Sequence, residues 1–527
     1  MNSFKTRVML GASALALASA IGANAYAATI FGGGSTLLAP VWTQQAFCYD
    51  DDAANQTYLL PESPLSRTVN ATTATGCPDN TGTLIRMDAT ASGIGEAGLF
   101  ANSPVASLFG TTAGTISTTV QYGLSDNSLV GTDLAAYDKG TGATETFAFQ
   151  GNTTTATAPA SLQGLTFSTA PVSGTNFPIS KGKYGPMVQF PVSIDPVAIT
   201  YNPTYTSGSA TFTFNIKNGA VLHLSKATYC GIFTGAITNW NDAALTADNA
   251  NTSLKSLSDS GTFSVPIKLV GRSDSSGTTS IFTRHLATVC GSADYTAGTT
   301  TLPSSVVALF STQPGSNEVA STVASTQGAM GYIGADYVLP AVTRTGGATN
   351  ARLAAAALAN SLGAFVLPTA TAASAAFGAL APPQSNSDGT YKSADTTTDR
   401  HDPTQWVQST AAGVPLANPT ATGSYPIVGT TNFIGYTCYA SGSSSVGILQ
   451  NFLNFGGGAT GKTILNNAAL GQLPTQWLVA IGDTFLNPTS PVVSGDTAAG
   501  LDLFIATVGA TGSTANPACA VSGVTGG

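Results

Sequence analysis

A change from strand to glycine-rich turn to helix recurs along this chain and limits the folds that it can adopt. Residues 28–31 read ATIF, a short apolar run, and Gly32-Gly33-Gly34-Ser35-Thr36 follows it before a helix-compatible stretch, APVWTQQAF. Short apolar runs and longer helical stretches separated by glycine and hydroxyl turns are typical of alternating strands and helices. Because this change recurs along the chain, the sequence predicts an α/β fold.

Two extended segments predict how the fold is divided. Residues 189–202 form an apolar, β-branched run that contains Pro191 and Pro196, and residues 425–440 have the same character. Proline cannot donate to a sheet ladder, so we expect extended crossings between two lobes rather than central strands. Two crossings far apart in sequence imply one discontinuous lobe and one continuous lobe. The expected limits are 28–196 with 424–527 for the first lobe and 197–423 for the second.

Residues 1–27 have the pattern of a secretory leader. Lys5 and Arg7 precede an apolar run, and Ala25-Tyr26-Ala27 offers small residues for cleavage. The apolar run is shorter than the roughly 20 residues that a membrane-spanning helix needs. We therefore expect a cleaved signal peptide and an exported protein, periplasmic or extracellular, that does not span the membrane.

The charge of the chain excludes some classes of partner. Charged residues make up only 8% of the sequence and the net charge is −8, whereas nucleic-acid and anionic-membrane binders need basic patches. Glycine, serine, threonine and alanine are abundant instead, and the polar stretches 49–85, 136–182 and 350–420 are predicted to be surface insertions or irregular segments. An acidic protein of this kind can still bind an anion locally.

The six cysteines of an exported chain favour disulfides over metal ligation or redox catalysis. Sequence alone leaves their connectivity open, although their order suggests that neighbours pair. The suggested pairs are Cys48 with Cys77, Cys230 with Cys290, and Cys438 with Cys519.

Four segments share one chemical style, in which glycines stand beside hydroxyl side chains at the start of a possible helix. Helix N-termini offer free backbone N–H groups and a favourable dipole to an anion, glycine allows close approach, and hydroxyls donate hydrogen bonds. Each segment alone is better explained as an ordinary turn or helix cap, but their combination with one arginine favours an anion site. The segments are Gly32 to Thr36, Ser92 to Gly95, Leu124 to Asn127, and Arg272 to Thr279.

Several of these motifs resemble those of PstS-type phosphate-binding proteins, the substrate-binding components of phosphate ABC transporters, and of their DING branch. The stretches that carry the resemblance are GGGSTLLAP, RSDSSGTTSIFT, LSKATYCGIFTGAITNWND, STQGAMGYIGADYV and, for the DING branch, LPTQWLVAIGDTFL with the last four cysteines. The resemblance implies a two-lobed type II periplasmic-binding fold with inorganic phosphate in the cleft, an ABC transporter permease as possible partner, a monomer, and neither cofactor nor metal. The phosphate ligands that it implies are Thr36, Leu37 through its backbone, Ser92, Asp126, Arg272, Ser276, Gly277 and Thr278.

The implied ligands have understandable physical roles. Arg272 offers a planar fork of donors, and Asp274 could hold its guanidinium in place. Ser276, Gly277 and Thr278 would cap a helix that begins near Thr279. Asp126 would repel a bare anion but accept a hydrogen bond from the P–O–H group of phosphate, which sulfate lacks. Outside the resemblance, Asp126 would read as an ordinary turn residue.

Two departures from the family pattern are visible. Leu37 and Leu38 stand where many members have Phe-Pro, and Ile94 stands where small or hydrogen-bonding residues are common. Only the backbone N–H of Leu37 is required for the implied site, so the first departure leaves that role intact.

Other patterns compete with this reading. Residues 456–463, GGGATGKT, match the P-loop pattern, but the preceding VGILQNFLNF reads as an amphipathic helix rather than the buried strand that a P-loop follows. His223, His285 and His401 are too scattered for a metal cluster or a catalytic triad, so we expect no enzyme. The alternatives are a secreted phosphomonoesterase and a structural or adhesive surface protein that keeps the fold.

Overall fold

The computed structural model describes residues 28–50, 82–102, 117–129, 181–338, 353–383, 403–407, 415–486 and 503–527, with one-residue gaps at 292, 379 and 521, and a few shorter pieces between 57 and 173. The expected leader, residues 1–27, lies outside the described residues. Most of the expected insertions 49–85 and 136–182 also lies outside them. Two short strand pairs within them are described, β2 (Thr57–Leu59) with β3 (Thr68–Asn70) and β6 (Thr144–Thr146) with β7 (Pro171–Ser173).

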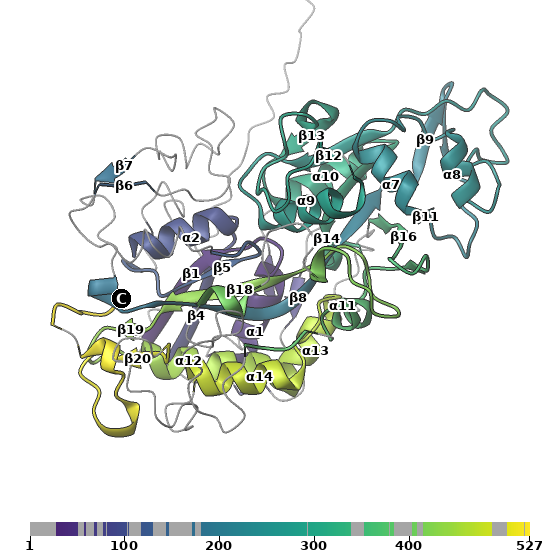
Figure 1. The fold of residues 1–527 in the computed structure, drawn as a ribbon. Helices are drawn as coiled ribbons and strands as arrows, with labels where there is room; N and C mark the ends of the chain where they lie inside the picture. Colours follow the sequence, from purple (N-terminus) through teal and green to yellow (C-terminus); the bar gives the residue numbers. More distant parts are fainter. Residues whose placement is uncertain are drawn as a thin grey trace, which may run out of the picture.

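A nine-stranded mixed sheet runs through the whole molecule (Figure 1). Its parallel strands lie toward the two ends, and antiparallel pairs join these ends in the middle. Together with the helices on its faces, this sheet confirms the predicted α/β fold. In spatial order the strands are β13 (Phe310–Gln313), β12 (Lys268–Arg272), β14 (Ala329–Gly334), β8 (Met187–Tyr201), β18 (Val428–Tyr436), β5 (Tyr122–Ser125), β1 (Ala28–Gly34) and β4 (Thr83–Asp88), and β15 (Ala354–Ala355) also pairs with β8.

Strand β8 connects the two ends of the sheet, and it corrects one expectation. It is a central strand of 15 residues despite its two prolines. Pro191 lies where the pairing with β18 shifts by one residue, and Pro196 lies at the end of that pairing, just before β8 changes partner to β14. Bulges and ladder ends need no N–H donor from the proline, so a central strand tolerates both residues there.

The partner change in β8 separates two groups of elements. We call the part with β1, β4, β5 and β18 the first lobe and the part with β12, β13 and β14 the second lobe, and we propose the step from Pro196 to Val197 as the boundary. In the first lobe, α2 (Ser92–Ala101) lies on one face of the sheet and α12 (Ser445–Gly457) with α14 (Thr475–Ile481) on the other (Figure 1). The second lobe carries α9 (Gly277–Val289) and α10 (Gly315–Ser325) against β14.

The remaining elements complete the two lobes. They are α1 (Ala39–Tyr49), α6 (Lys181–Tyr184), α7 (Lys226–Phe233), α8 (Ala243–Asp248), α11 (Ala370–Phe377) and α13 (Ala459–Asn467), with the short strands β9 (Thr204–Ser207), β10 (Ala210–Thr213), β11 (His223–Leu224), β16 (Ala357–Ala359), β17 (Phe365–Val366), β19 (Cys438–Tyr439) and β20 (Ala506–Thr507).

Aromatic side chains fill the core of both lobes. In the first lobe Phe190 stacks on Phe433 with 5.1 Å between ring centroids, and the indole N–H of Trp42 donates to the hydroxyl of Tyr122 at 2.9 Å. In the second lobe Phe282 stacks on Tyr332 at 4.1 Å. Because β8 carries Phe190 into the first core and pairs with Tyr332 further along, the two cores share one strand.

The six cysteines form three disulfides. They join Cys48 to Cys77, Cys230 to Cys290, and Cys438 to Cys519, the pairing that the sequence order suggests. The second of these ties α7 to the end of α9 within the second lobe. Within the described part of the chain, no helix combines the length and the apolar character needed to cross a membrane.

The glycine run at the end of β1 allows tight packing of the first-lobe sheet. Gly34 has φ of +135°, and a Cβ added there would lie 2.0 Å from the carbonyl oxygen of Leu124 on β5. A side chain is therefore excluded both by the backbone conformation and by the neighbouring strand.

We expect Gly34→Ala to lower the free energy of unfolding by about 3 kcal/mol, from backbone strain and overpacking combined. The measurement is urea unfolding followed by circular dichroism. Gly447→Ala in α12 is the control, because a Cβ there meets no atom within 4 Å; we expect it to change stability by no more than about 1 kcal/mol. Equal effects of the two substitutions would contradict the packing argument.

Candidate functional site

Helices from both lobes begin at one place. Gly277, the first residue of α9 in the second lobe, lies so close to the first lobe that an added Cβ would be 2.5 Å from Cβ of Asp126 and 2.6 Å from Oγ of Ser92. Ser92 is itself the first residue of α2. Thr36, in the turn before α1, shares a hydrogen bond of 3.1 Å with Ser316 in the first turn of α10. The free N–H groups of several helix N-termini therefore converge, which favours an anion.

Arg272 is the buried cation of this site. It ends β12 and only 3% of its surface is exposed. Its Nε donates to Asp274 at 2.6 Å and its Nη2 donates to the same carboxylate, while Nη1 reaches Ser316 at 3.1 Å and Thr36 at 3.3 Å. Burial by itself would lower the pKa of Arg272, but the charge and hydrogen bonds of Asp274 outweigh it and hold the pKa above its usual value. Asp274 thus orients the guanidinium and leaves Nη1 facing the first lobe.

Asp126 is the buried acid of the site and follows β5. Its Oδ1 accepts hydrogen bonds from the hydroxyl of Ser35 and, at 2.6 Å, from the hydroxyl of Thr431, and its backbone N–H donates to Ser92 Oγ at 3.1 Å. Burial holds the pKa of Asp126 above its usual value, and the bonds from Ser35 and Thr431 and the positive charge of Arg272 only partly oppose that rise. The carboxyl is therefore supplied with donors in an interior where an unpaired charge would be costly.

The backbone around Asp126 is held by an asparagine on β18. The side-chain amide of Asn432 donates to the carbonyl oxygens of Ser125 at 3.2 Å and Asn127 at 3.4 Å. One side chain thus holds the carbonyl groups of the residues before and after Asp126, which limits the positions that the carboxyl can take.

The N-terminus of α9 begins two residues earlier than the sequence predicts. The N-cap is Ser276, whose Oγ accepts from the N–H of Thr279 at 3.2 Å, and the helix starts at Gly277. The hydroxyl oxygen of Thr278 is buried; it forms no hydrogen bond of full geometry with a described residue, but it interacts with the carboxyl of Asp126. A buried hydroxyl in this position can donate to another polar group at the site.

All the sequence-predicted site residues lie in described parts of the chain and gather at this place: Thr36, Leu37, Ser92, Asp126, Arg272, Asp274, Ser276, Gly277 and Thr278. The N–H of Leu37 points to Ser35 Oγ at 3.2 Å, and its side chain is fully buried. The assignment of these residues as phosphate ligands stays a prediction.

The predicted set of ligands lacks four polar residues that lie in or beside the site. Ser35, Ser316, Thr431 and Asp195 contact Asp126, Arg272 or one another. Ser35 and Ser316 stand next to helix starts, as the other candidates do, so the same pattern could have found them. Thr431 and Asp195 lie within strands, and no local pattern marks them.

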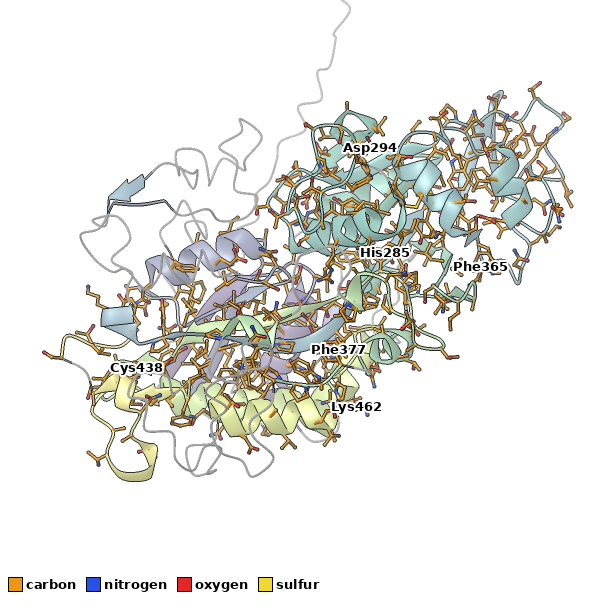
Figure 2. All side chains as sticks on the ribbon, viewed as in Figure 1. His285, Asp294, Phe365, Phe377, Cys438 and Lys462 are labelled. Atoms are coloured by element: carbon orange, nitrogen blue, oxygen red, sulfur yellow. A yellow bond between two sulfur atoms is a disulfide. The ribbon has the colours of Figure 1, made fainter. Side chains whose placement is uncertain are left out.

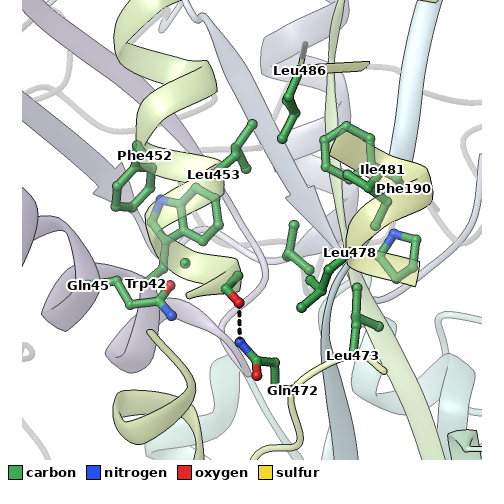
Figure 3. A pocket seen from close by; sticks show the side chains of 14 residues that line it. Trp42, Gln45, Phe190, Phe452, Leu453, Gln472, Leu473, Leu478, Ile481 and Leu486 are labelled. Carbon is green, nitrogen blue, oxygen red and sulfur yellow. Dashed lines mark hydrogen bonds between the residues drawn. The ribbon is translucent and has the colours of Figure 1, made fainter. Parts of the chain in front are cut away.

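The P-loop-like stretch is confirmed as a helix junction. Gly456 and Gly457 end α12, and α13 begins at Ala459. Gln472 donates to the carbonyl oxygen of Gly457 at 2.6 Å, beside an apolar pocket of about 40 Å³ that includes Trp42 (Figure 3). The segment follows a helix instead of a strand, and Lys462 projects outward from the surface (Figure 2). It therefore lacks the context that a P-loop requires.

The histidines are explained by packing where the structure describes them. His285 on α9 is buried, and its ring nitrogens bond the carbonyl oxygen of Ala417 at 2.7 Å and the hydroxyl of Tyr229 at 3.1 Å. His223 stacks on Phe365, and His401 lies outside the described residues. In the described ranges, no three His, Cys, Asp or Glu side chains are grouped so as to hold a metal ion.

Comparison with known proteins gives matches that extend over much of the chain. The model of the PBP superfamily domain matches residues 101–456. Among curated relatives, Alkaline phosphatase L of Pseudomonas aeruginosa is 29% identical over 413 residues, which cover 76% of this chain and 81% of the relative. The same-named protein of a second strain is 30% identical, covering 59% of this chain and 70% of the relative. A Phosphate-binding protein from an unknown prokaryotic organism is 26% identical, covering 60% and 76%.

Solved structures share the two-lobed fold. A high affinity periplasmic phosphate-binding protein, PfluDING, bound with phosphate, aligns with a TM-score of 0.53 at 23% identity, covering 89% of this chain and 97% of that one. The ancestral soluble variant of the Human Phosphate Binding Protein aligns with a TM-score of 0.55, with the same identity and coverage. The family model matches more than half of the chain, so the chain belongs to the PBP superfamily.

Proposed function

We propose that this protein is an exported phosphate-binding protein that captures inorganic phosphate between its two lobes. One observation carries the proposal: Arg272 and Asp126 are buried and lie close to helix N-termini from both lobes. The relatives named as phosphate-binding proteins and the phosphate-bound solved structure support the same ligand.

The chemistry of the site suits a protonated oxyanion. Arg272, the hydroxyls of Thr36 and Thr278 and the N-terminus of α9 are donors for phosphate oxygens. Asp126 is the acceptor. Phosphate still carries a proton near neutral pH, and its P–O–H group can donate a hydrogen bond to the Asp126 carboxylate. Sulfate has no such proton, so it would place oxygen against oxygen in a buried site.

Binding is expected to be coupled to movement of the lobes. The contacts of Thr36 with Ser316 and Arg272 join the two lobes. Gly277 of the second lobe also packs against Asp126 of the first lobe. A ligand enters only if these contacts open, and closure then supplies donors from both lobes. The hinge that we propose is the pair of strands β8 and β18.

Export and delivery complete the proposal. Three disulfides suit an oxidising compartment, and a leader at residues 1–27 is predicted from the sequence. We propose that the mature protein works in the periplasm or outside the cell, without crossing the membrane, and hands phosphate to an ABC transporter permease or scavenges it.

Relatives named Alkaline phosphatase L bring in a second candidate, a secreted phosphomonoesterase. We favour a binding protein without turnover, because the donors around Arg272 and Asp126 are arranged to enclose the anion and Asp126 Oδ1 already accepts two hydroxyl hydrogen bonds. The two candidates differ in whether the bound phosphate is released from an ester.

Arg272→Ala should weaken phosphate binding by at least about 100-fold, because it removes charge-assisted hydrogen bonds to the anion. The measurement is isothermal titration calorimetry on the phosphate-free mature protein. Arg86→Ala is the matched control, since Arg86 also pairs with an aspartate, Asp50 at 3.1 Å, but lies in β4 away from the site. Micromolar binding that survives Arg272→Ala would refute this site.

Asp126→Asn should reduce the preference for phosphate over sulfate by at least about tenfold, because a neutral amide can donate to sulfate where the carboxylate repels it. Competition calorimetry with both anions measures the ratio. Asp242→Asn, at the cap of α8 in the second lobe, serves as the control with an unchanged ratio. An unaltered ratio in Asp126→Asn would remove Asp126 from the selectivity mechanism.

Purified mature protein should not hydrolyse p-nitrophenyl phosphate above the background rate, with or without added divalent metal ions. The measurement is the release of nitrophenol over several hours. The protein sample is one that calorimetry has shown to be fully able to bind phosphate. Turnover that Arg272→Ala abolishes would instead favour the phosphomonoesterase.

A further inference from the structure

Asp195 and Thr431 lie behind Asp126, on the two strands that connect the lobes. Both side chains are fully buried, Asp195 on β8 and Thr431 on β18. The hydroxyl oxygen of Thr431 lies 2.6 Å from Asp126 Oδ1 and 2.7 Å from Asp195 Oδ2. One hydroxyl thus stands between two buried carboxyl groups.

Counting protons shows that this arrangement needs one more than Thr431 can supply. Each of the two short contacts is an O–H···O distance and requires a hydrogen between its oxygens. A threonine hydroxyl has a single hydrogen, so it can donate to only one of the two carboxyls. The second contact therefore needs a proton on a carboxyl group, which then donates to Thr431.

The surroundings of the two carboxyls decide which one holds that proton. Burial raises the pKa of Asp126, but the hydrogen bond from Ser35 and the positive charge of Arg272 oppose that rise. Asp195 Oδ1 is buried and forms no hydrogen bond of full geometry with a described residue, and the interactions with Ser193 and with the backbone of Thr431 only partly offset the effect of burial on its pKa. A buried carboxylate without a cation beside it costs more to ionise than one that faces Arg272, so the proton belongs on Asp195.

The charges around Asp195 point the same way. Several elements that pack against β8 carry ionisable side chains. These are Arg284 and neutral His285 on α9, Glu318 on α10, Tyr332 on β14, Tyr436 on β18, and Asp336 and Tyr337 on η5 (Ala335–Tyr337). Burial raises the pKa of Asp195 to about 8, and the negative charge of Asp126 adds to the rise. Asp195 is therefore neutral at pH 7.

We propose that Asp195 is a positioning residue of the anion site: as a neutral acid it donates to Thr431, which fixes the Thr431 hydroxyl as a donor to an ionised Asp126. This proposal rests on the proposed function, because the ligand whose proton Asp126 accepts is phosphate. Loss of the Asp195 proton would leave two negative charges and one hydroxyl hydrogen beside the bound anion. Phosphate affinity should then fall by up to about tenfold for each pH unit above about 8.

Calorimetry of phosphate binding between pH 6.5 and pH 9.5 tests this dependence in wild type and in Asp195→Asn. The amide of asparagine stays neutral and can still donate to Thr431, so we expect an affinity within about threefold of wild type at pH 7 and no fall above pH 8. Asp242→Asn, remote from the site, should keep the wild-type profile. The same pH profile in wild type and Asp195→Asn would overturn the proposal.

Thr431 provides a second pair of variants. Thr431→Val removes the donor to Asp126 and should lower phosphate affinity about tenfold at pH 7, whereas Thr431→Ser keeps the hydroxyl and should restore it to near the wild-type value. If serine fails to rescue what valine loses, Thr431 acts through packing, and the positioning role of Asp195 is wrong.

A measurement without ligand separates this proposal from the proposed function. The folded protein keeps a proton on Asp195 that the unfolded chain releases above about pH 4, so rising pH destabilises wild type relative to Asp195→Asn. Urea unfolding should show the ratio of their folding equilibrium constants growing about tenfold per pH unit from about pH 5 to about pH 7. A growing ratio in a protein that binds no phosphate would refute the proposed function alone. A constant ratio would refute the proton on Asp195.

Discussion

The buried pair of Arg272 and Asp274 is the interaction on which the arrangement of the site depends. A guanidinium this deep in the protein is tolerated only if a carboxylate neutralises it and its remaining N–H groups find acceptors. Asp274 accepts hydrogen bonds from Nε and Nη2 of the guanidinium, and Thr36 and Ser316 accept from Nη1. Because Thr36 belongs to the first lobe, satisfying the cation also links the lobes.

Strands β8 and β18 place the acidic half of the site opposite this cation. The pairing of these strands shifts by one residue between Thr431 and Asn432. Thr431 bonds the carboxyl of Asp126, and Asn432 bonds the carbonyl oxygens of the residues before and after Asp126. The extra residue of this bulge, Val192, lies on β8. A bulge bends the strand pair and increases its local twist beside the loop that carries Asp126.

The sequence predicts the local features of this protein well where the cause lies within a few residues. Arg272 and Asp274 are two positions apart, and Ser276 caps its own helix, so both relations can be expected from the chain itself. The helix start at Gly277 differs by two residues from the expected one, which is the usual uncertainty of a cap. The prediction that the prolines of β8 exclude a central strand was wrong. The bulge and the change of partner depend on β18 and β14, so the sequence of β8 alone does not reveal them.

Residue type and short spacing are enough to predict the α/β alternation and the hydroxyl- and glycine-rich character of the anion-binding segments. The connectivity of the cysteines stays open in the sequence and is settled by the fold. The participation of Ser35, Ser316, Thr431 and Asp195 follows from tertiary contacts. Thr431 is 305 positions from Asp126 and 236 from Asp195, and Thr36 is 280 from Ser316. Contacts at such separations depend on strand register and on the closure of two lobes, where a shift of one residue turns a side chain to the other face.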